Sequence, residues 1–129
     1  MYFRASMRTD VGVVRERNED FAYIDPAGRF VVLADGMGGH GAGDVASEMA
    51  VDVVKTILDR FDLWHATRRQ IEQTLVRACS LANDAVLARS ERERDKHGMG
   101  TTLEVVVLRG PEAFIAHVGD SRTYHLRDG

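Results

Sequence analysis

The spacing of hydrophobic residues changes twice along the chain and divides it into three parts. In the first part, residues 20–24 and 30–34 are short apolar runs separated by the turn-forming stretch Asp-Pro-Ala-Gly, which predicts two strands. The second run, Phe-Val-Val-Leu-Ala, is apolar throughout, as in a strand buried on both faces. The chain is therefore expected to begin with β-structure.

The middle part has helical spacing. Over residues 44–61, apolar residues recur every three or four positions and form one wide face. A second helix is predicted from Thr67, because Thr67 and Gln70 form a capping-box pattern in which both side chains bind free backbone N–H groups. Its apolar face continues to the charged run after Arg89. Two long helices joined by residues 62–66 favour an antiparallel pair on one face of a sheet.

The last part returns to the short apolar runs of strands. We predict strands from such runs at residues 102–108 and 113–118, and a third, alternating strand at residues 122–126 after a tight turn. The order of strands, two helices and strands favours an α+β fold with a largely antiparallel sheet and helices packed outside it. A chain of 129 residues has room for one domain, which we place at residues 1–129.

The final residues carry a turn signal. Asp128-Gly129 after an alternating run is typical of a hairpin, and no returning strand follows it. We therefore expect residues 124–126 to be an unpaired edge, and the domain to be incomplete at its C-terminus.

Composition and charge exclude several classes of protein. The chain is 44% hydrophobic and 29% charged with a net charge of −3, so it lacks the basic excess of a nucleic-acid-binding surface. No apolar run approaches the roughly 20 residues of a membrane-spanning helix, and the first residues do not resemble a signal peptide. The single cysteine, Cys79, is expected to be a core residue in a reducing compartment. These features predict a soluble cytoplasmic domain without a membrane segment or a nucleic-acid partner.

Asp35 is the most informative acid. It follows a buried apolar run, where an ionised carboxylate is costly unless something compensates it. Five glycines lie in the next eight positions and allow the backbone to approach a ligand closely. Such a site suits Mg²⁺ or Mn²⁺, which bind carboxylates, backbone carbonyls and water. An Asx-turn or helix-capping role for Asp35 is the alternative.

The glycine tract also has a second interpretation. Gly-Met-Gly-Gly-His-Gly at 36–41 satisfies the pattern of a dinucleotide-binding loop. However, Asp35 would face a pyrophosphate with no metal to screen it, and the next helix leads to another helix rather than to the parallel strand of a Rossmann unit. The Gly-Lys-Ser/Thr of a P-loop is absent as well. Nucleotide binding is therefore the distant alternative.

Two further segments place acids at the ends of predicted strands. Glu19 and Asp20 begin a strand shortly after Arg15, so their side chains should point to opposite faces. The planar guanidinium of Arg15 suits two-point binding of a phosphate. Asp120 lies in a tight turn after an apolar strand. Taken singly, these segments also fit a charged surface turn and an ordinary hairpin turn.

Together the segments resemble the motifs of bacterial PP2C-type (PPM family) metal-dependent protein serine/threonine phosphatases. Four motifs occur in the family's order and cover essentially the whole chain. They are Thr9-Asp10-Val11-Gly12 with Arg15 and Asn18-Glu19-Asp20, residues 33–40 running into 43–47, residues 98–103, and residues 117–122. The resemblance implies a PP2C-like β-sandwich flanked by antiparallel helices, in α/β/β/α layers, of which this chain holds the N-terminal part.

The resemblance also implies an activity. Members of the family hydrolyse phosphoserine and phosphothreonine in proteins, using a water bridged by two Mn²⁺ or Mg²⁺ ions. The implied partners are phosphorylated proteins, the substrates of serine/threonine kinases in signalling. Asp35 would bridge both metals and Gly36 would contribute its backbone carbonyl. Glu19 and Asp20 would hold metal-bound waters or orient the ligands, and Arg15 would bind the substrate phosphate.

Two departures from the family pattern matter. Some relatives carry a His directly after the Asp-Gly pair as a general acid, and Met37 stands there in this chain. The family also has a later Asp-Gly pair and an Asp-Asn pair that supply further metal ligands. Asp120 is implied to help hold a third metal, and the only acid after it in this sequence is Asp128 in the terminal turn. We therefore expect the 129-residue chain alone to be weakly active or inactive. A non-catalytic regulatory or binding domain of the same fold is the alternative.

Overall fold

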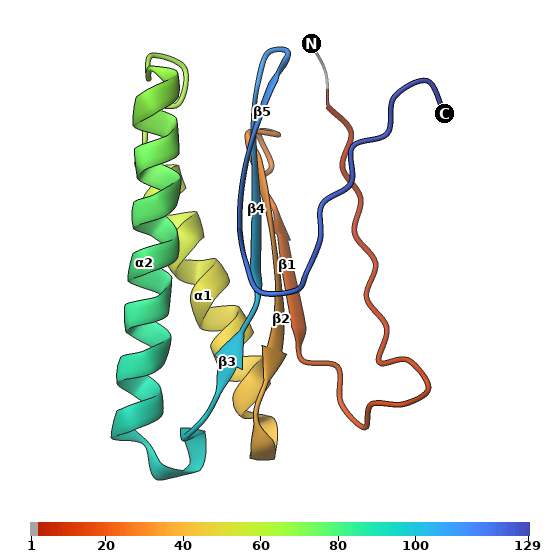
Figure 1. The fold of residues 1–129 in the computed structure, drawn as a ribbon, viewed down its shortest axis with the longest axis vertical. Helices are drawn as coiled ribbons and strands as arrows, with labels where there is room; N and C mark the ends of the chain where they lie inside the picture. The colour runs from red at the N-terminus through yellow and green to blue at the C-terminus, as the bar shows by residue number, and fades with distance from the viewer. Residues whose placement is uncertain (1–2) are drawn as a thin grey trace.

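The computed structural model describes residues 3–129. For His40 it describes the backbone but not the side chain. These residues form one sheet and two long helices (Figure 1). The strands are β1 (Asp20–Ile24), β2 (Phe30–Met37), β3 (Gly100–Thr101), β4 (Leu103–Arg109) and β5 (Glu112–Val118). The helices are α1 (Ala42–Asp59) and α2 (Arg68–Arg92), with short 3-10 turns at Gly39–Gly41 and Arg94–Lys96.

All strand pairs are antiparallel, in the order β1-β2-β4-β5, and the short β3 pairs with the end of β2. The predicted α+β class with an antiparallel sheet is confirmed. Strand β2 runs three residues past the predicted end at residue 34, because Thr101 and Gly100 of β3 pair with Gly36 and Met37. Asp35 and Gly36 therefore lie within a strand rather than in a loop after it.

Helices α1 and α2 cover one face of the sheet (Figure 1). Burial alternates along β2: Phe30 and Val32 are buried, whereas Leu33 is 41% exposed. Because side chains alternate across a strand, the buried set faces the helices. Helix α1 meets this set with small buried residues such as Ala46 and Ala50, which let the helix pack closely on the sheet. The core thus lies between one sheet face and the helical layer.

Both helix predictions are confirmed. Thr67 caps α2 by accepting a hydrogen bond from the Gln70 backbone N–H at 3.1 Å, and the Gln70 side chain accepts from the Thr67 backbone N–H at 2.8 Å. This is the predicted capping box. Helix α1 begins at Ala42, two residues before the predicted start, after Gly41 turns the chain with a φ of 76°.

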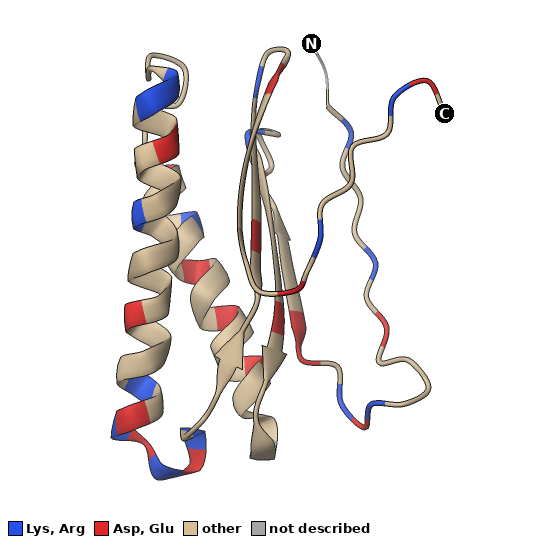
Figure 2. Cartoon of the chain, in the orientation of Figure 1, with Lys and Arg blue, Asp and Glu red and all other residues tan. Residues whose placement is uncertain are grey.

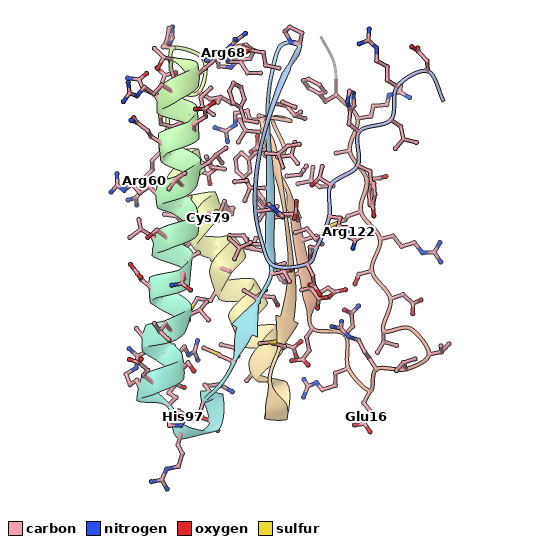
Figure 3. The ribbon with its side chains drawn as sticks, in the orientation of Figure 1. Glu16, Arg60, Arg68, Cys79, His97 and Arg122 are labelled. Atoms are coloured by element: carbon pink, nitrogen blue, oxygen red, sulfur yellow. The ribbon has the colours of Figure 1, made fainter. Side chains whose placement is uncertain are left out.

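The helices bear on the predictions about Cys79 and about a membrane segment. Cys79 on α2 is half-buried against the core (Figure 3), and this burial raises the pKa of its thiol. Its prediction as a core residue is confirmed. Neither α1 nor α2 combines the length and apolarity that would let a helix of the described chain cross a membrane.

The other face of the sheet has no helix in the part of the chain that the structure describes. The segments before β1 and after β5 run along this side (Figure 1). The predicted strand at 122–126 is wrong, because this segment is held by side chains instead of backbone pairing. Ser121 Oγ lies 2.6 Å from Thr102 Oγ1, and Thr123 Oγ1 donates to Glu104 Oε2 at 2.6 Å. Residues 3–129 thus contain one sheet and one helical layer of the predicted sandwich.

Candidate metal centre

The pairing of β1 with β2 places two carboxylates opposite each other. Asp20 is the register partner of Asp35, and residues directly opposite on antiparallel strands project from the same face of a sheet. This is the face without helices, because the neighbours of Asp35 along β2, Ala34 and Gly36, are buried under α1. Acidic positions on β1 and β2 lie next to each other in Figure 2.

Arg15 spans this pair of acids. Its Nη2 donates to Asp35 Oδ1 at 2.7 Å, and its Nη1 donates to Asp20 Oδ1 at 3.3 Å. These charge-assisted contacts raise the pKa of Arg15, with the hydrogen bond to Asp35 as the main cause. The residue predicted to bind phosphate therefore contacts two of the predicted metal ligands directly.

The acidic pair carries an electrostatic cost. Burial raises the pKa of Asp20, and the neighbouring Asp35 raises it further, whereas Arg15 lowers it. A carboxylate that loses water and faces a second negative charge favours its neutral form. Positive charge at this point therefore stabilises the ionised pair.

Glu19 points to the opposite side from Asp20, as the strand alternation predicted. Its carboxylate lies against the first turn of α1, where a Cβ added to Gly43 would come within 1.9 Å of Glu19 Oε2. Its backbone carbonyl accepts hydrogen bonds from the Gly36 N–H at 3.1 Å and from Ser47 Oγ at 2.8 Å. Glu19 Oε2 is buried and has no hydrogen-bond partner among the described residues. Glu19 thus packs behind β2, under the candidate centre.

An ion pair joins the segment before β1 to the start of α1. Arg17 Nη2 donates to Asp44 Oδ2 in the first turn of α1 at 2.8 Å. The Arg17 guanidinium also lies where a side chain at Gly41 would begin, 3.0 Å from the position of a Cβ there. Glycine at this position therefore leaves room for Arg17 and permits the positive φ.

Asp120 lies in a bend just after β5, exposed to solvent. Its neighbour Ser121 contacts Thr102 Oγ1, which accepts a hydrogen bond from the Asp35 backbone N–H at 3.0 Å. The loop that carries Asp120 is thus linked to the Asp35 backbone through one threonine hydroxyl.

The structure brings some of the predicted site residues together. Arg15, Asp20 and Asp35 are in direct contact, and Gly36 adjoins Asp35. Among the side chains that the structure describes, which leave out that of His40, no three His, Cys, Asp or Glu gather closely enough to hold a metal ion. The candidate centre is therefore a pair of carboxylates, with Glu19 and Asp120 outside that pair.

Three residues of the site escaped the sequence argument. Arg17, Thr102 and Ser121 have roles that depend on partners far away in the chain. The only local hint is that residues 98–103 and 117–122 resemble family motifs. That resemblance points to the two segments but does not predict which residues they contact.

The nucleotide-loop alternative fails on topology. A Rossmann unit needs a parallel strand after its helix, whereas every strand pair in the described chain is antiparallel. Gly36 moreover belongs to β2 and packs on α1, since a Cβ there would lie 2.0 Å from Gly43 O. Gly36 and Gly43 therefore allow β2 and α1 to pack closely against each other.

Comparison with known proteins agrees with this geometry. The family model for protein phosphatase 2C matches residues 14–129. The chain belongs to the protein phosphatase 2C family. The match includes Arg15, Asp20 and Asp35 in the contact described above.

The relatives of the chain are bacterial phosphatases. It is 39% identical to the serine/threonine protein phosphatase PstP of Mycobacterium tuberculosis over 129 residues, which is 100% of this chain and 24% of PstP. It is 41% identical to the serine/threonine phosphatase stp of Listeria monocytogenes over 133 aligned positions, 96% of this chain and 50% of that protein. The chain therefore spans a quarter to a half of these relatives.

A solved structure of similar fold contains metal. The catalytic domain of PstP in complex with two manganese ions has a TM-score of 0.78 and 41% identity, over 95% of this chain and 50% of that one. The PP2C fold is thus confirmed for the described residues.

Proposed function

We propose that residues 1–129 are the N-terminal part of a metal-dependent phosphatase domain that removes phosphate from phosphoserine and phosphothreonine in proteins. The observation that carries this proposal is the Asp20–Asp35 pair, bridged by Arg15, in a chain similar to serine/threonine phosphatases. Phosphorylated proteins are then the substrates, made by serine/threonine kinases.

The residues present fit a hard divalent cation. Asp20 and Asp35 offer oxygen donors only, which suits Mn²⁺ and Mg²⁺. Burial and the neighbouring Asp35 raise the pKa of Asp20 even with Arg15 present, so further positive charge would favour its ionised form. We assign metal contacts to Asp35, the Gly36 carbonyl and Asp20, with Glu19 as a supporting carboxylate behind them. Its buried, unpartnered oxygen is consistent with that position.

The proposed chemistry divides between metal and protein. Two divalent cations lower the pKa of a shared water and offset negative charge on the phosphoryl oxygens. Arg15 binds the substrate phosphate through its planar guanidinium, and Asp120 helps to hold a third, weaker metal. Met37 has no acidic proton, so a different group protonates the leaving serine or threonine oxygen.

Calorimetric titration with Mn²⁺ tests the metal site. We expect the metal-stripped wild-type chain to bind Mn²⁺, and Asp35→Asn to lose that binding. Asp84→Asn is the matched control, because Asp84 is an exposed acid on α2. Binding that survives in Asp35→Asn contradicts the assignment.

A phosphopeptide assay tests the activity. We expect Mn²⁺-dependent release of phosphate by a longer chain that also carries the family's later motifs, and little release by the 129-residue chain. Absence of both metal binding and turnover would support a non-catalytic binding domain instead.

A further inference from the structure

Arg15 occupies the same oxygens that a metal would need. Its two terminal nitrogens contact Oδ1 of Asp20 and Oδ1 of Asp35, on two different strands. A guanidinium that donates to two carboxylates at once neutralises part of their charge. A divalent cation on the same carboxylates would repel this guanidinium at a distance of a few ångströms.

Arg15 also lies at a solvent-exposed position. Its side chain is 46% exposed, and its neighbours Val13 and Val14 project into solvent. The loop before β1 is tied at its base, where Asn18 Nδ2 donates to Thr9 Oγ1 at 2.5 Å. The segment that bears Arg15 lies between these two residues and has few contacts other than those of Arg15 with the two carboxylates.

We propose that Arg15 is an internal cation that neutralises the Asp20–Asp35 pair until a divalent metal displaces it, and that its release makes the guanidinium available to phosphate. This inference rests on the proposed metal-dependent phosphatase function. It adds that one side chain couples the two binding events. Metal binding breaks the Arg15 contacts, and phosphate then gives Arg15 a new partner.

The coupling has a definite sign. Metal binding is weakened by competition with Arg15, so removal of the guanidinium should tighten it. Phosphate holds the displaced Arg15, so phosphate and metal should each increase the affinity of the other, by reciprocal linkage. Without Arg15 this mutual enhancement should disappear.

The experiment compares Mn²⁺ affinities of metal-stripped variants by calorimetry. We expect Arg15→Gln to bind Mn²⁺ about three- to tenfold more tightly than wild type, because the competing guanidinium is lost. Arg15→Lys should lie between the two, since a point charge cannot span both carboxylates. Inorganic phosphate, kept below the concentration at which its manganese salt precipitates, should tighten Mn²⁺ binding in wild type and not in Arg15→Gln.

Arg17→Gln is the matched control. It removes the same charge two residues away, but Arg17 pairs with Asp44 and not with the acidic pair. We expect a change in Mn²⁺ affinity of less than about twofold, which separates competition from long-range electrostatics. Equal effects of the two variants, or no tightening in Arg15→Gln, overturn the inference and leave the proposed function standing. Absence of Mn²⁺ binding in wild type and every variant overturns both.

Discussion

At the scale of single residues, the site depends on contacts that leave no space for an extra atom. Gly36 and Gly43 let β2 and α1 touch beside Glu19. A Cβ on Gly36 would lie 2.0 Å from Gly43 O, and a Cβ on Gly43 would lie 1.9 Å from Glu19 Oε2, both well inside van der Waals contact. Asp35 is consequently held from behind by packing and in front by Arg15. The carboxylate that the sequence singled out is thus positioned by glycine packing as well as by a charged partner.

Gly36→Ala tests this close approach. The added methyl group would lie 2.0 Å from Gly43 O, which is backbone and cannot turn aside. We expect the free energy of unfolding to fall by about 3 kcal/mol or more, measured by denaturant titration. Gly39→Ala is the control, because a Cβ there meets nothing within 4 Å. Similar stability of the two variants would contradict the argument.

Thr102→Val tests the link between Asp35 and the loop of Asp120. Valine has nearly the same shape but leaves the Asp35 N–H without its acceptor and Ser121 without its partner. We expect a loss of about 1–3 kcal/mol in the free energy of unfolding and faster hydrogen exchange of the Asp35 amide. Thr102→Ser keeps the hydroxyl and should retain slow exchange at that amide. Fast exchange in both variants would mean that the hydroxyl does not protect it.

At the scale of elements, ion pairs join turns to helices. The Arg29 guanidinium donates two hydrogen bonds to the buried carboxylate of Asp25, at 2.8 Å and 2.9 Å, and a third to Asp59 near the end of α1 at 3.1 Å. The β1–β2 turn is thereby fixed to the helix that covers the sheet. Arg109 acts similarly near β5, since its guanidinium donates to the backbone carbonyls of Leu63 and Ala66 between α1 and α2.

The Asp25 pair has a pH dependence whose sign follows from its pKa. The hydrogen bonds from Arg29 hold the pKa of Asp25 below its ordinary value of 3.8. The ionised carboxylate therefore stabilises the fold above pH 3.8, and this contribution is lost as the pH falls through the folded pKa.

Asp25→Asn should accordingly cost most at neutral pH. We expect a loss of about 2–3 kcal/mol in the free energy of unfolding near pH 7, because Arg29 loses a buried partner. The difference from wild type should shrink as the pH falls through the folded pKa of Asp25, because the wild-type carboxyl then becomes protonated too. Denaturant titrations at several pH values measure this, with the exposed Asp84→Asn as control. A difference that does not vary with pH would rule out the charge as its source.

At the scale of the whole molecule, one sheet holds the helical layer on one face and the acidic pair on the other. The hydrophobic core and the candidate centre therefore share a single strand, β2, with alternate residues serving each. Binding at Asp20 and Asp35 should consequently stabilise the sheet as a unit.

Thermal unfolding in Mn²⁺ tests this coupling. A ligand that binds only the folded state at about 100 times its Kd adds about 2.7 kcal/mol to the free energy of unfolding. We expect the midpoint temperature to rise with Mn²⁺ concentration and to return to its starting value with a chelator. Asp35→Asn should abolish the rise, whereas Asp84→Asn should keep it. An equal rise in Asp35→Asn would place the stabilising metal elsewhere.

Much of the molecule could be predicted from the sequence, because the relevant signals are local. The capping box at Thr67 and the apolar spacing of both helices depend on residues within a few positions of each other. Strand alternation likewise placed Glu19 and Asp20 on opposite faces. The predicted strand at 122–126 failed, since an alternating segment forms a strand only where a partner backbone lies beside it.

The sequence by itself determined both helices, the four longer strands and the antiparallel α+β class, and it singled out Asp35 as a candidate ligand. Only the tertiary structure decided that β3 extends β2 through Gly36, that Asp20 lies opposite Asp35, and that Arg15 bridges the two acids. The physical reason is that a helix or a turn is stabilised by neighbours in the chain, whereas strand register and the partners of a charge are chosen between distant segments. The candidate metal centre depends on that second kind of choice.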